Sequence, residues 1–182
     1  TLELRNCSRE LDLVDDSITA VEYMRKLRNV RKTIQTAFGK DVYNNYIKII
    51  NQAGTDPERY INELLQNADD CEYLQGVNPS FKLEISKDFK KIGTRYNEVG
   101  FTKANVRAIT AIGESTKKRL IAGEKDGNLI GEKGVGFKAV FAVANKVSIY
   151  SGDFCFELSA DEPTIPKLIE KNDKFEKGTA ML

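Results

Sequence analysis

The stretch that decides the fold is RYINELLQNADD, residues 59–70. An α-helix turns by about 100° per residue, so Glu63, Asn67 and Asp70 project from one face, within about 60° of each other. The opposite side carries Ile61, Leu64, Leu65, Ala68 and Cys71. An amide oxygen is a hard ligand for Mg²⁺, and a carboxylate one turn away can hold and deprotonate a water molecule. An amphipathic helix with a solvated polar face explains the same spacing, so both interpretations stay open.

A second stretch, GEKGVGFK at residues 131–138, places Gly131, Gly134 and Gly136 before an apolar segment. Glycine lets the backbone approach a ligand closely, and a following helix offers free N–H groups to a phosphate. The spacing G-x-x-G-x-G is neither the dinucleotide fingerprint nor the P-loop. Phosphate binding and a flexible glycine-rich loop explain this stretch equally well.

Two shorter segments lie at predicted strand ends. YNEVGFT, residues 96–102, puts an acid beside a glycine, where a carboxylate can accept a hydrogen bond from the amino group of a base. An ordinary strand-to-helix turn explains this segment as well. Gly178-Thr179 opens the last predicted strand and has no meaning by itself.

The rest of the chain shows a helical part followed by a mixed part. Apolar residues three or four apart, with breaks at Gly39 and Gly54-Thr55-Asp56-Pro57, predict helices over 10–38, 42–50, 57–73, 102–112 and 135–144. Alternating apolar residues predict strands over 81–85, 92–97, 146–150, 154–158 and 179–182. This order predicts an α+β fold with helices on one face of a mostly antiparallel sheet.

Composition narrows the function classes. The 182 residues suit one domain, and 28 Lys and Arg against 27 Asp and Glu give a net charge of +1, which argues against nucleic acid as the partner. The chain has no histidine, which excludes Ser-His-Asp and Cys-His catalysis. Its three cysteines, Cys7, Cys71 and Cys155, lie far apart, so we expect an intracellular, reducing compartment, cytoplasmic or nuclear.

We expect no membrane partner, because no apolar run approaches the ~20 residues of a membrane span. No signal peptide is visible. The chain starts at Thr1 without a methionine and stops at Leu182 in a predicted strand, so we expect a fragment of a longer protein.

Taken together and in this order, the four segments resemble the GHKL ATPases, which include gyrase, the ninety-kilodalton heat-shock chaperone, histidine kinases and MutL. Glu63, Asn67 and Asp70 match the E-x-x-x-N-x-x-D helix of that superfamily, and Gly131–Gly136 and Gly178-Thr179 match its second glycine box and its terminal G-T strand. NELLQNADDCEY, NEVGF, AIGESTKK and GEKGVGFKAVF look most like the sacsin and NO VEIN type of these domains. The resemblance covers residues 55–182, with residues 1–54 as a helical lead-in.

The resemblance implies a Bergerat fold, a two-layer sandwich of a mixed, mostly antiparallel sheet with helices on one face and ATP or ADP between the layers. It implies that Asn67 binds Mg²⁺, that Glu63 activates the attacking water, that Thr179 supports the adenine end and that residues 113–130 form a lid. The remaining nucleotide contacts that it implies are Asp70, Asn97, Glu98, Gly100, Ser115, Thr116, Lys117, Gly131, Lys133, Gly134, Val135, Gly136 and Phe137.

One departure from the pattern concerns the adenine. Alignment on Gly100 places Tyr96 where the superfamily has its adenine-contacting aspartate, and Glu98 at the first glycine. Either Asn97 or Glu98 takes over that role, or adenine is contacted loosely, and the longer Glu98 side chain could crowd the pocket.

The resemblance implies slow, Mg²⁺-dependent ATP hydrolysis, weak in isolation, that works as a lid-closing switch in a larger, chaperone-like protein. Downstream domains of the same chain and a homodimer formed on ATP binding are the implied partners. A nucleotide-sensing or scaffold module without hydrolysis is the alternative. A histidine-kinase role is disfavoured because Glu63 suits hydrolysis and the chain has no histidine to receive a phosphate.

Overall fold

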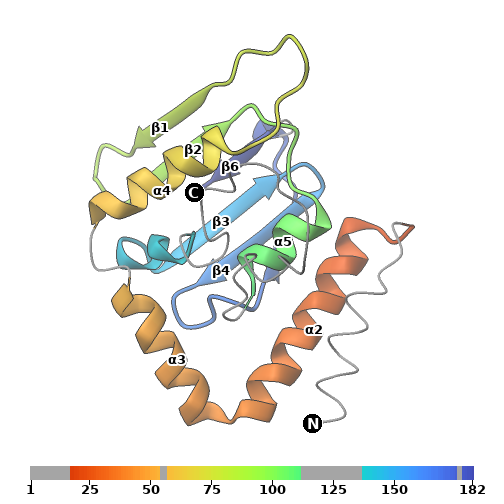
Figure 1. The fold of residues 1–182 in the computed structure, drawn as a ribbon, viewed down its shortest axis with the longest axis vertical. Helices are drawn as coiled ribbons and strands as arrows, with labels where there is room; N and C mark the ends of the chain where they lie inside the picture. The colour runs from red at the N-terminus through yellow and green to blue at the C-terminus, as the bar shows by residue number, and fades with distance from the viewer. Residues whose placement is uncertain (1–16, 54–56, 112–136, 176–177) are drawn as a thin grey trace, which may run out of the picture.

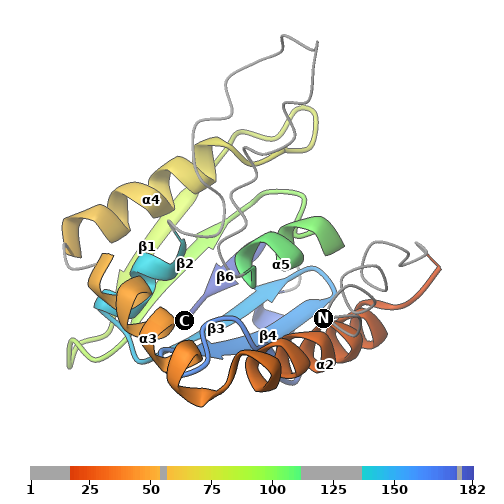
Figure 2. The ribbon, with the colours of Figure 1, turned by 60° about the horizontal axis from the view of Figure 1, so that its bottom comes forward.

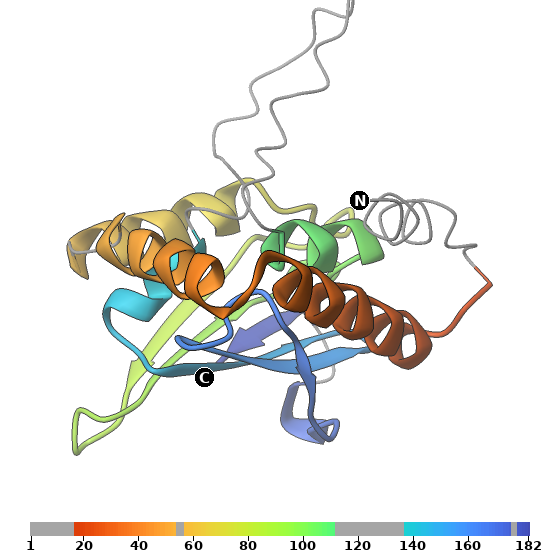
Figure 3. The same ribbon diagram turned by 90° about the horizontal axis from the view of Figure 1, so that it is seen from below.

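A computed structural model describes residues 17–53, 57–111, 137–175 and 178–182. The described α-helices lie on one face of the sheet, which is clearest in the view along the sheet (Figures 1 and 3). The sheet has six strands in the order β1-β2-β6-β3-β4-β5, and every pairing among them is antiparallel. This two-layer α+β arrangement is the fold class that the sequence predicts.

Local signals mark several of the helix ends. Thr19 caps the first helix through a capping box with Glu22, and Gly39, at φ +79°, ends it. Thr102 caps a shorter helix through a capping box with Asn105. The helical elements are α2 (Ala20–Phe38), α3 (Lys40–Ala53), α4 (Pro57–Asp69), α5 (Lys103–Ile109) and the 3₁₀ helices η2 (Phe137–Ala142) and η3 (Asp173–Phe175).

Two hairpins and two late strands build the sheet. β1 (Phe81–Ile85) pairs with β2 (Ile92–Tyr96), and β3 (Lys146–Ser151) pairs with β4 (Phe154–Ser159). The last strand, β6 (Thr179–Met181), inserts between the two hairpins, and the short β5 (Lys167–Leu168) extends the edge at β4. The end of the chain is therefore central in the sheet, where Thr179 pairs with Tyr96 on one side and Ser151 on the other.

The core lies between the helices and the inner face of the sheet (Figure 2). β3 and β4 turn alternate side chains toward the helices, as a half-buried strand does. α2 and α4 contribute their apolar stripes to the same cluster. Its largest fully buried apolar members are Tyr23, Phe156, Met24, Leu27, Leu64, Ile149, Leu158 and Val106.

Several helix predictions differ from the structure. Residues 17–19 precede α2 and are not helical, although a helix was predicted over 10–38, and α3 spans Lys40–Ala53 where 42–50 was predicted. α4 ends at Asp69, not at Tyr73, because the chain turns there. The backbone carbonyl of Glu72 instead accepts a hydrogen bond from the backbone N–H of Val99 (3.0 Å). α5 ends at Ile109, and the described part of 135–144 is a 3₁₀ helix where an α-helix was expected.

The amphipathic pattern of residues 59–70 also needs correction at two positions. Leu65, predicted on the apolar side, is 46% exposed. Cys71 lies beyond the end of α4, so the helical spacing does not apply to it, and it lines a cavity instead. Within the described ranges, no helix combines the length and the apolar character that crossing a membrane requires.

Candidate functional site

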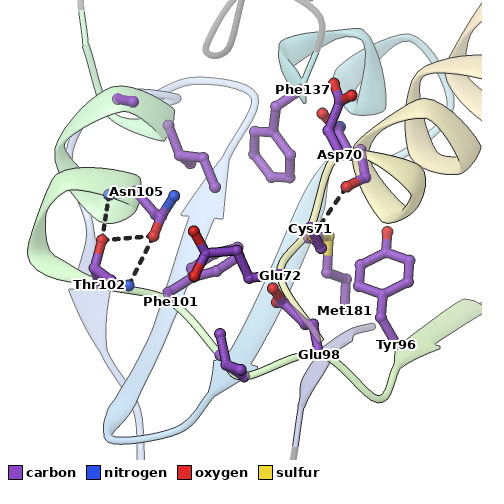
Figure 4. A pocket seen from close by; sticks show the side chains of 15 residues that line it. Asp70, Cys71, Glu72, Tyr96, Glu98, Phe101, Thr102, Asn105, Phe137 and Met181 are labelled. Carbon is purple, nitrogen blue, oxygen red and sulfur yellow. Dashed lines mark hydrogen bonds between the residues drawn. The ribbon is translucent and has the colours of Figure 1, made fainter. Parts of the chain in front are cut away.

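A cavity of about 290 Å³ lies between the C-terminal end of α4, the end of β2 and α5 (Figure 4). Its volume is near the lower bound of small-molecule sites. Several carboxylates and amides face a floor of apolar side chains. The lining residues are Asn67, Asp70, Cys71, Glu72, Tyr96, Glu98, Val99, Gly100, Phe101, Thr102, Asn105, Ala108, Ile109, Phe137 and Met181.

The structure brings some of the predicted site residues together at this cavity. Those that line it are Asn67, Asp70, Glu98, Gly100 and Phe137, whereas Glu63, Asn97 and Thr179 do not. The other predicted contacts lie outside the described residues: Ser115, Thr116, Lys117, Gly131, Lys133, Gly134, Val135 and Gly136.

Glu98 is a buried acid at the end of β2. Its side chain is 8% exposed, and its Oε1 accepts a hydrogen bond from the Thr179 hydroxyl at the start of β6. Thr179 is in turn bonded to the hydroxyl of Ser151, at the end of β3, over 2.5 Å. Three separate segments therefore hold one carboxylate at the cavity wall, because β6 lies between β2 and β3.

Asn97 faces away from the cavity. Its Oδ1 accepts a hydrogen bond from the backbone N–H of Ser80 (2.7 Å), and its Nδ2 donates to the carbonyl of Asn78 (2.8 Å). Both ends of the amide are thus used to tie the loop before β1 to the end of β2. Of the two residues left open by the sequence, only Glu98 reaches the cavity.

Tyr96 forms part of the cavity floor and carries an unusual hydroxyl. The residue is 3% exposed, stacks on Phe81 with ring centroids 5.4 Å apart, and has no hydrogen-bond partner for its hydroxyl among the described residues. Burial raises the pKa of Tyr96, and the nearby Thr94 hydroxyl offsets part of that rise without aligning as a partner. A buried hydroxyl without a partner is costly, which is a feature of sites that bind polar ligands.

The turn after α4 forms the opposite wall. The Cys71 thiol donates to the carbonyl of Asn67 (2.9 Å), and the Tyr73 hydroxyl donates to the carbonyl of Ala68 (2.6 Å). These side chains supply donors to carbonyls in the last turn of the helix, where intrahelical partners run out; the carbonyl of Ala68 also accepts from the backbone N–H of Cys71 (3.4 Å). Asn67 and Asp70 line the cavity together with Tyr96 and Phe137, and Figure 4 shows the last three of these residues.

Lys138 was not singled out in the sequence, yet the structure buries it. It is 3% exposed, and its Nζ donates to the carbonyl of Ala111 (2.6 Å), the last residue described before 137. Burial, with a smaller contribution from the charge of Arg31, lowers the pKa of Lys138 to about 8. A lysine directly after a glycine-rich segment was the available signal, but a lysine at such a position is usually solvated.

Ser151 and Tyr96 are among the further residues that the sequence did not assign to the site. The partners of Ser151, Phe101 and Thr179, are 50 and 28 residues away from it. No local signal could have linked Ser151 to Thr179, because the two residues come together only when β6 pairs with β3 in the sheet.

No group of three or more Cys, Asp or Glu side chains within the described ranges could hold a metal ion by itself. Mg²⁺ at nucleotide sites is commonly held by one or two side chains together with the phosphates. The carbonyl of the Asn67 amide is one of the hard oxygens that line the cavity and suit such an ion.

Comparison with known proteins adds independent information. No family model matches the chain. It is 40% identical to Protein NO VEIN of Arabidopsis thaliana over an alignment that covers 58% of this chain and 4% of that protein. It is 29% identical to Chaperone protein HtpG of Mesorhizobium japonicum, over 68% of this chain and 22% of that protein.

A second HtpG, from Desulfitobacterium hafniense, is 34% identical over 58% of this chain and 20% of its own length. The chain is similar to HtpG chaperones and to Protein NO VEIN. This similarity supports the GHKL-like ATPase superfamily that the motifs indicate. The chain spans less than a quarter of the length of each of these relatives.

Proposed function

We propose that the chain is an ATP-binding domain of the GHKL type that hydrolyses ATP slowly, with Mg²⁺, as a conformational switch in a larger, chaperone-like protein. The observation that carries the proposal is the buried Glu98 carboxylate, which the Thr179 hydroxyl holds in the wall of a cavity that Asn67 also lines. The similarity to HtpG chaperones supports ATP binding and a chaperone-type role.

The cavity fits a nucleoside at its Glu98 end. Glu98 offers an acceptor, the Tyr96 hydroxyl has no described partner, and Phe137, Met181 and Ile109 offer apolar surface for a base. A flat ring with one amino group at its edge satisfies this combination of apolar walls and few polar groups. We assign adenine to this end and the phosphates to the rim at Asn67.

Each remaining role follows from chemistry that the side chain can perform. Asn67 would bind Mg²⁺, which when present neutralises charge on the phosphates. Glu63, one helical turn earlier on α4, would position the attacking water and take its proton. Residues 1–54 as a helical lead-in, residues 55–182 as the nucleotide-binding unit, and a homodimer formed on ATP binding belong to the same proposal.

The proposal is tested by calorimetric titration with ADP and with a non-hydrolysable ATP analogue, each with and without Mg²⁺. Asn67→Ala should abolish the Mg²⁺-dependent part of the affinity. Asn62→Ala is the matched control, because Asn62 is an exposed asparagine on the same helix, and it should leave the affinity unchanged. A parent protein that binds neither nucleotide refutes the proposal.

A domain that binds nucleotide without hydrolysing it is the second candidate. Its support is that Glu63 does not line the cavity and that Tyr96 stands where an aspartate is expected. Phosphate release measured on the parent and on Glu63→Gln separates the two candidates. Turnover that disappears in Glu63→Gln supports hydrolysis, whereas equal rates in both proteins remove the catalytic role of Glu63.

A further inference from the structure

A chain of hydrogen bonds runs behind the cavity and ends on Glu98. The backbone N–H of Phe101 donates to the Ser151 hydroxyl (2.7 Å), Ser151 is bonded to Thr179 (2.5 Å), and Thr179 donates to Glu98. Ser151 is 0% exposed and Thr179 1% exposed, so bulk water does not substitute for these partners. These hydrogen bonds thus form a buried network that ends on the Glu98 carboxylate.

The two ends of this network determine the direction of every proton in it. A backbone N–H can only donate and a carboxylate can only accept. Thr179 has one proton and uses it on Glu98, so the proton between Ser151 and Thr179 comes from Ser151. Each hydroxyl therefore points its proton toward Glu98.

The carboxylate on which the network ends belongs to the cavity wall. Glu98 lines the cavity, and only its Oε1 receives a hydrogen bond from a described residue. A carboxylate oxygen without a described donor can accept a hydrogen bond from a ligand in the cavity. The loop that carries Glu98 also closes onto Ser151, since a Cβ on Gly100 would lie 3.6 Å from the Ser151 hydroxyl.

We propose that Ser151 is a positioning residue that makes Glu98 a fixed hydrogen-bond acceptor, and that this orientation selects nucleotides whose base presents an amino group. The inference rests on the proposed function, because it assumes that the base lies against Glu98. It assigns a role to Ser151, which touches no ligand, and it predicts that an oxo group in place of the amino group is rejected.

The first test is the affinity ratio of ADP to IDP, which differ in having an amino or an oxo group at one ring position. The parent should prefer ADP by roughly tenfold to a hundredfold, because an oxo group leaves the carboxylate facing another acceptor. In Glu98→Gln the Thr179 hydroxyl still donates to the amide oxygen, so the amide NH₂ faces the base. The preference should then reverse in favour of IDP.

The second test is Ser151→Ala in the Glu98→Gln background. Without the Ser151 proton, Thr179 is free to accept from the amide, which can turn over, and the preference for IDP should fall toward unity. Ser148→Ala is the matched control, because Ser148 lies three residues earlier on β3 and takes no part in the network. It should leave the ratio unchanged.

The affinity ratio separates positioning from a purely structural role. If Ser151→Ala in the Glu98→Gln background changes the affinities for ADP and IDP by the same factor, Ser151 has no part in selectivity and the inference is overturned. A Glu98→Gln variant that keeps the parent's preference for ADP also overturns it. If the parent binds neither nucleotide, the proposed function fails as well, so the two failures are distinguishable.

Discussion

Replacing Gly178 by alanine adds one methyl group, and the structure predicts a large loss of stability from this small change. It has φ +72°, and a Cβ built on it would lie 1.9 Å from the carbonyl oxygen of Tyr96 in β2. The next residue, Thr179, pairs with Tyr96 and donates to Glu98. Gly178→Ala should therefore push the start of β6 away from β2 and release Thr179 from Glu98.

The expected loss has two parts. A non-glycine residue in the left-handed region costs about 1–2 kcal/mol. The contact with Tyr96 cannot be relieved by a side-chain rotation, so the Tyr96–Thr179 pair must open, and the lost hydrogen bonds add about 1 kcal/mol each. We expect the free energy of unfolding to fall by about 3–4 kcal/mol and the affinity for ADP to fall with it.

Urea denaturation followed by circular dichroism measures the stability change. Gly76→Ala is the matched control, since Gly76 has a similar φ of +80° and a Cβ there meets no atom within 4 Å. That variant should lose only about 1 kcal/mol, the backbone strain alone. Equal losses in the two variants would refute the argument that the contact with Tyr96 decides the residue at 178.

Three further outcomes follow from individual side chains. Because the folded state releases the proton of Lys138 near pH 8 while the unfolded chain keeps it until about 10.5, stability due to this group rises with pH in that window. Denaturation curves give the free energy of unfolding of the parent minus that of Lys138→Met. This difference should be about 3 kcal/mol larger at the top of the window than at pH 7, and a difference that does not change with pH contradicts the lowered pKa. Asn97→Ala should lose about 1 kcal/mol of stability, through its bonds to Ser80 and Asn78, yet keep the parent's ADP affinity in a calorimetric titration; a lost affinity would return Asn97 to the site. Tyr96→Phe should raise the melting temperature of the free protein, because it removes a buried hydroxyl without a described partner, and should weaken ADP binding; a lowered melting temperature would show that the hydroxyl has a partner.

Most of the described helices and strands follow from short-range signals. The capping residue Thr102, the break at Gly39 and the alternation in 81–85 each act within a few residues, so local sequence predicts them. The end of α4 could not be predicted in the same way. It depends on the bond between Glu72 and Val99, which are 27 residues apart.

In the candidate site, too, some residues could be predicted from local sequence and others could not. Asn67 and Asp70 were predicted from spacing on one helix, and both line the cavity, Asn67 from the last turn of α4 and Asp70 from just beyond its end, whereas Glu63 does not line it. The choice between Asn97 and Glu98 depends instead on where the strand stops pairing, since adjacent residues of an extended chain point to opposite sides. If the strand pairing were shifted by one residue, Asn97 would point toward the cavity and Glu98 away from it.

By itself, the sequence of this protein determined the α+β class, the helix that carries Asn67 and the family resemblance, because each depends on periodicity or on residues close together in the chain. Tertiary structure alone decided that Glu98, and not Asn97, lines the cavity, that Ser151 is linked to it through Thr179, and that Tyr96 also lines the cavity. Glu98 and Thr179 are 81 residues apart, and they meet only because β6 enters the sheet between β2 and β3. A contact made by strand insertion leaves no trace in the spacing of the residues that form it.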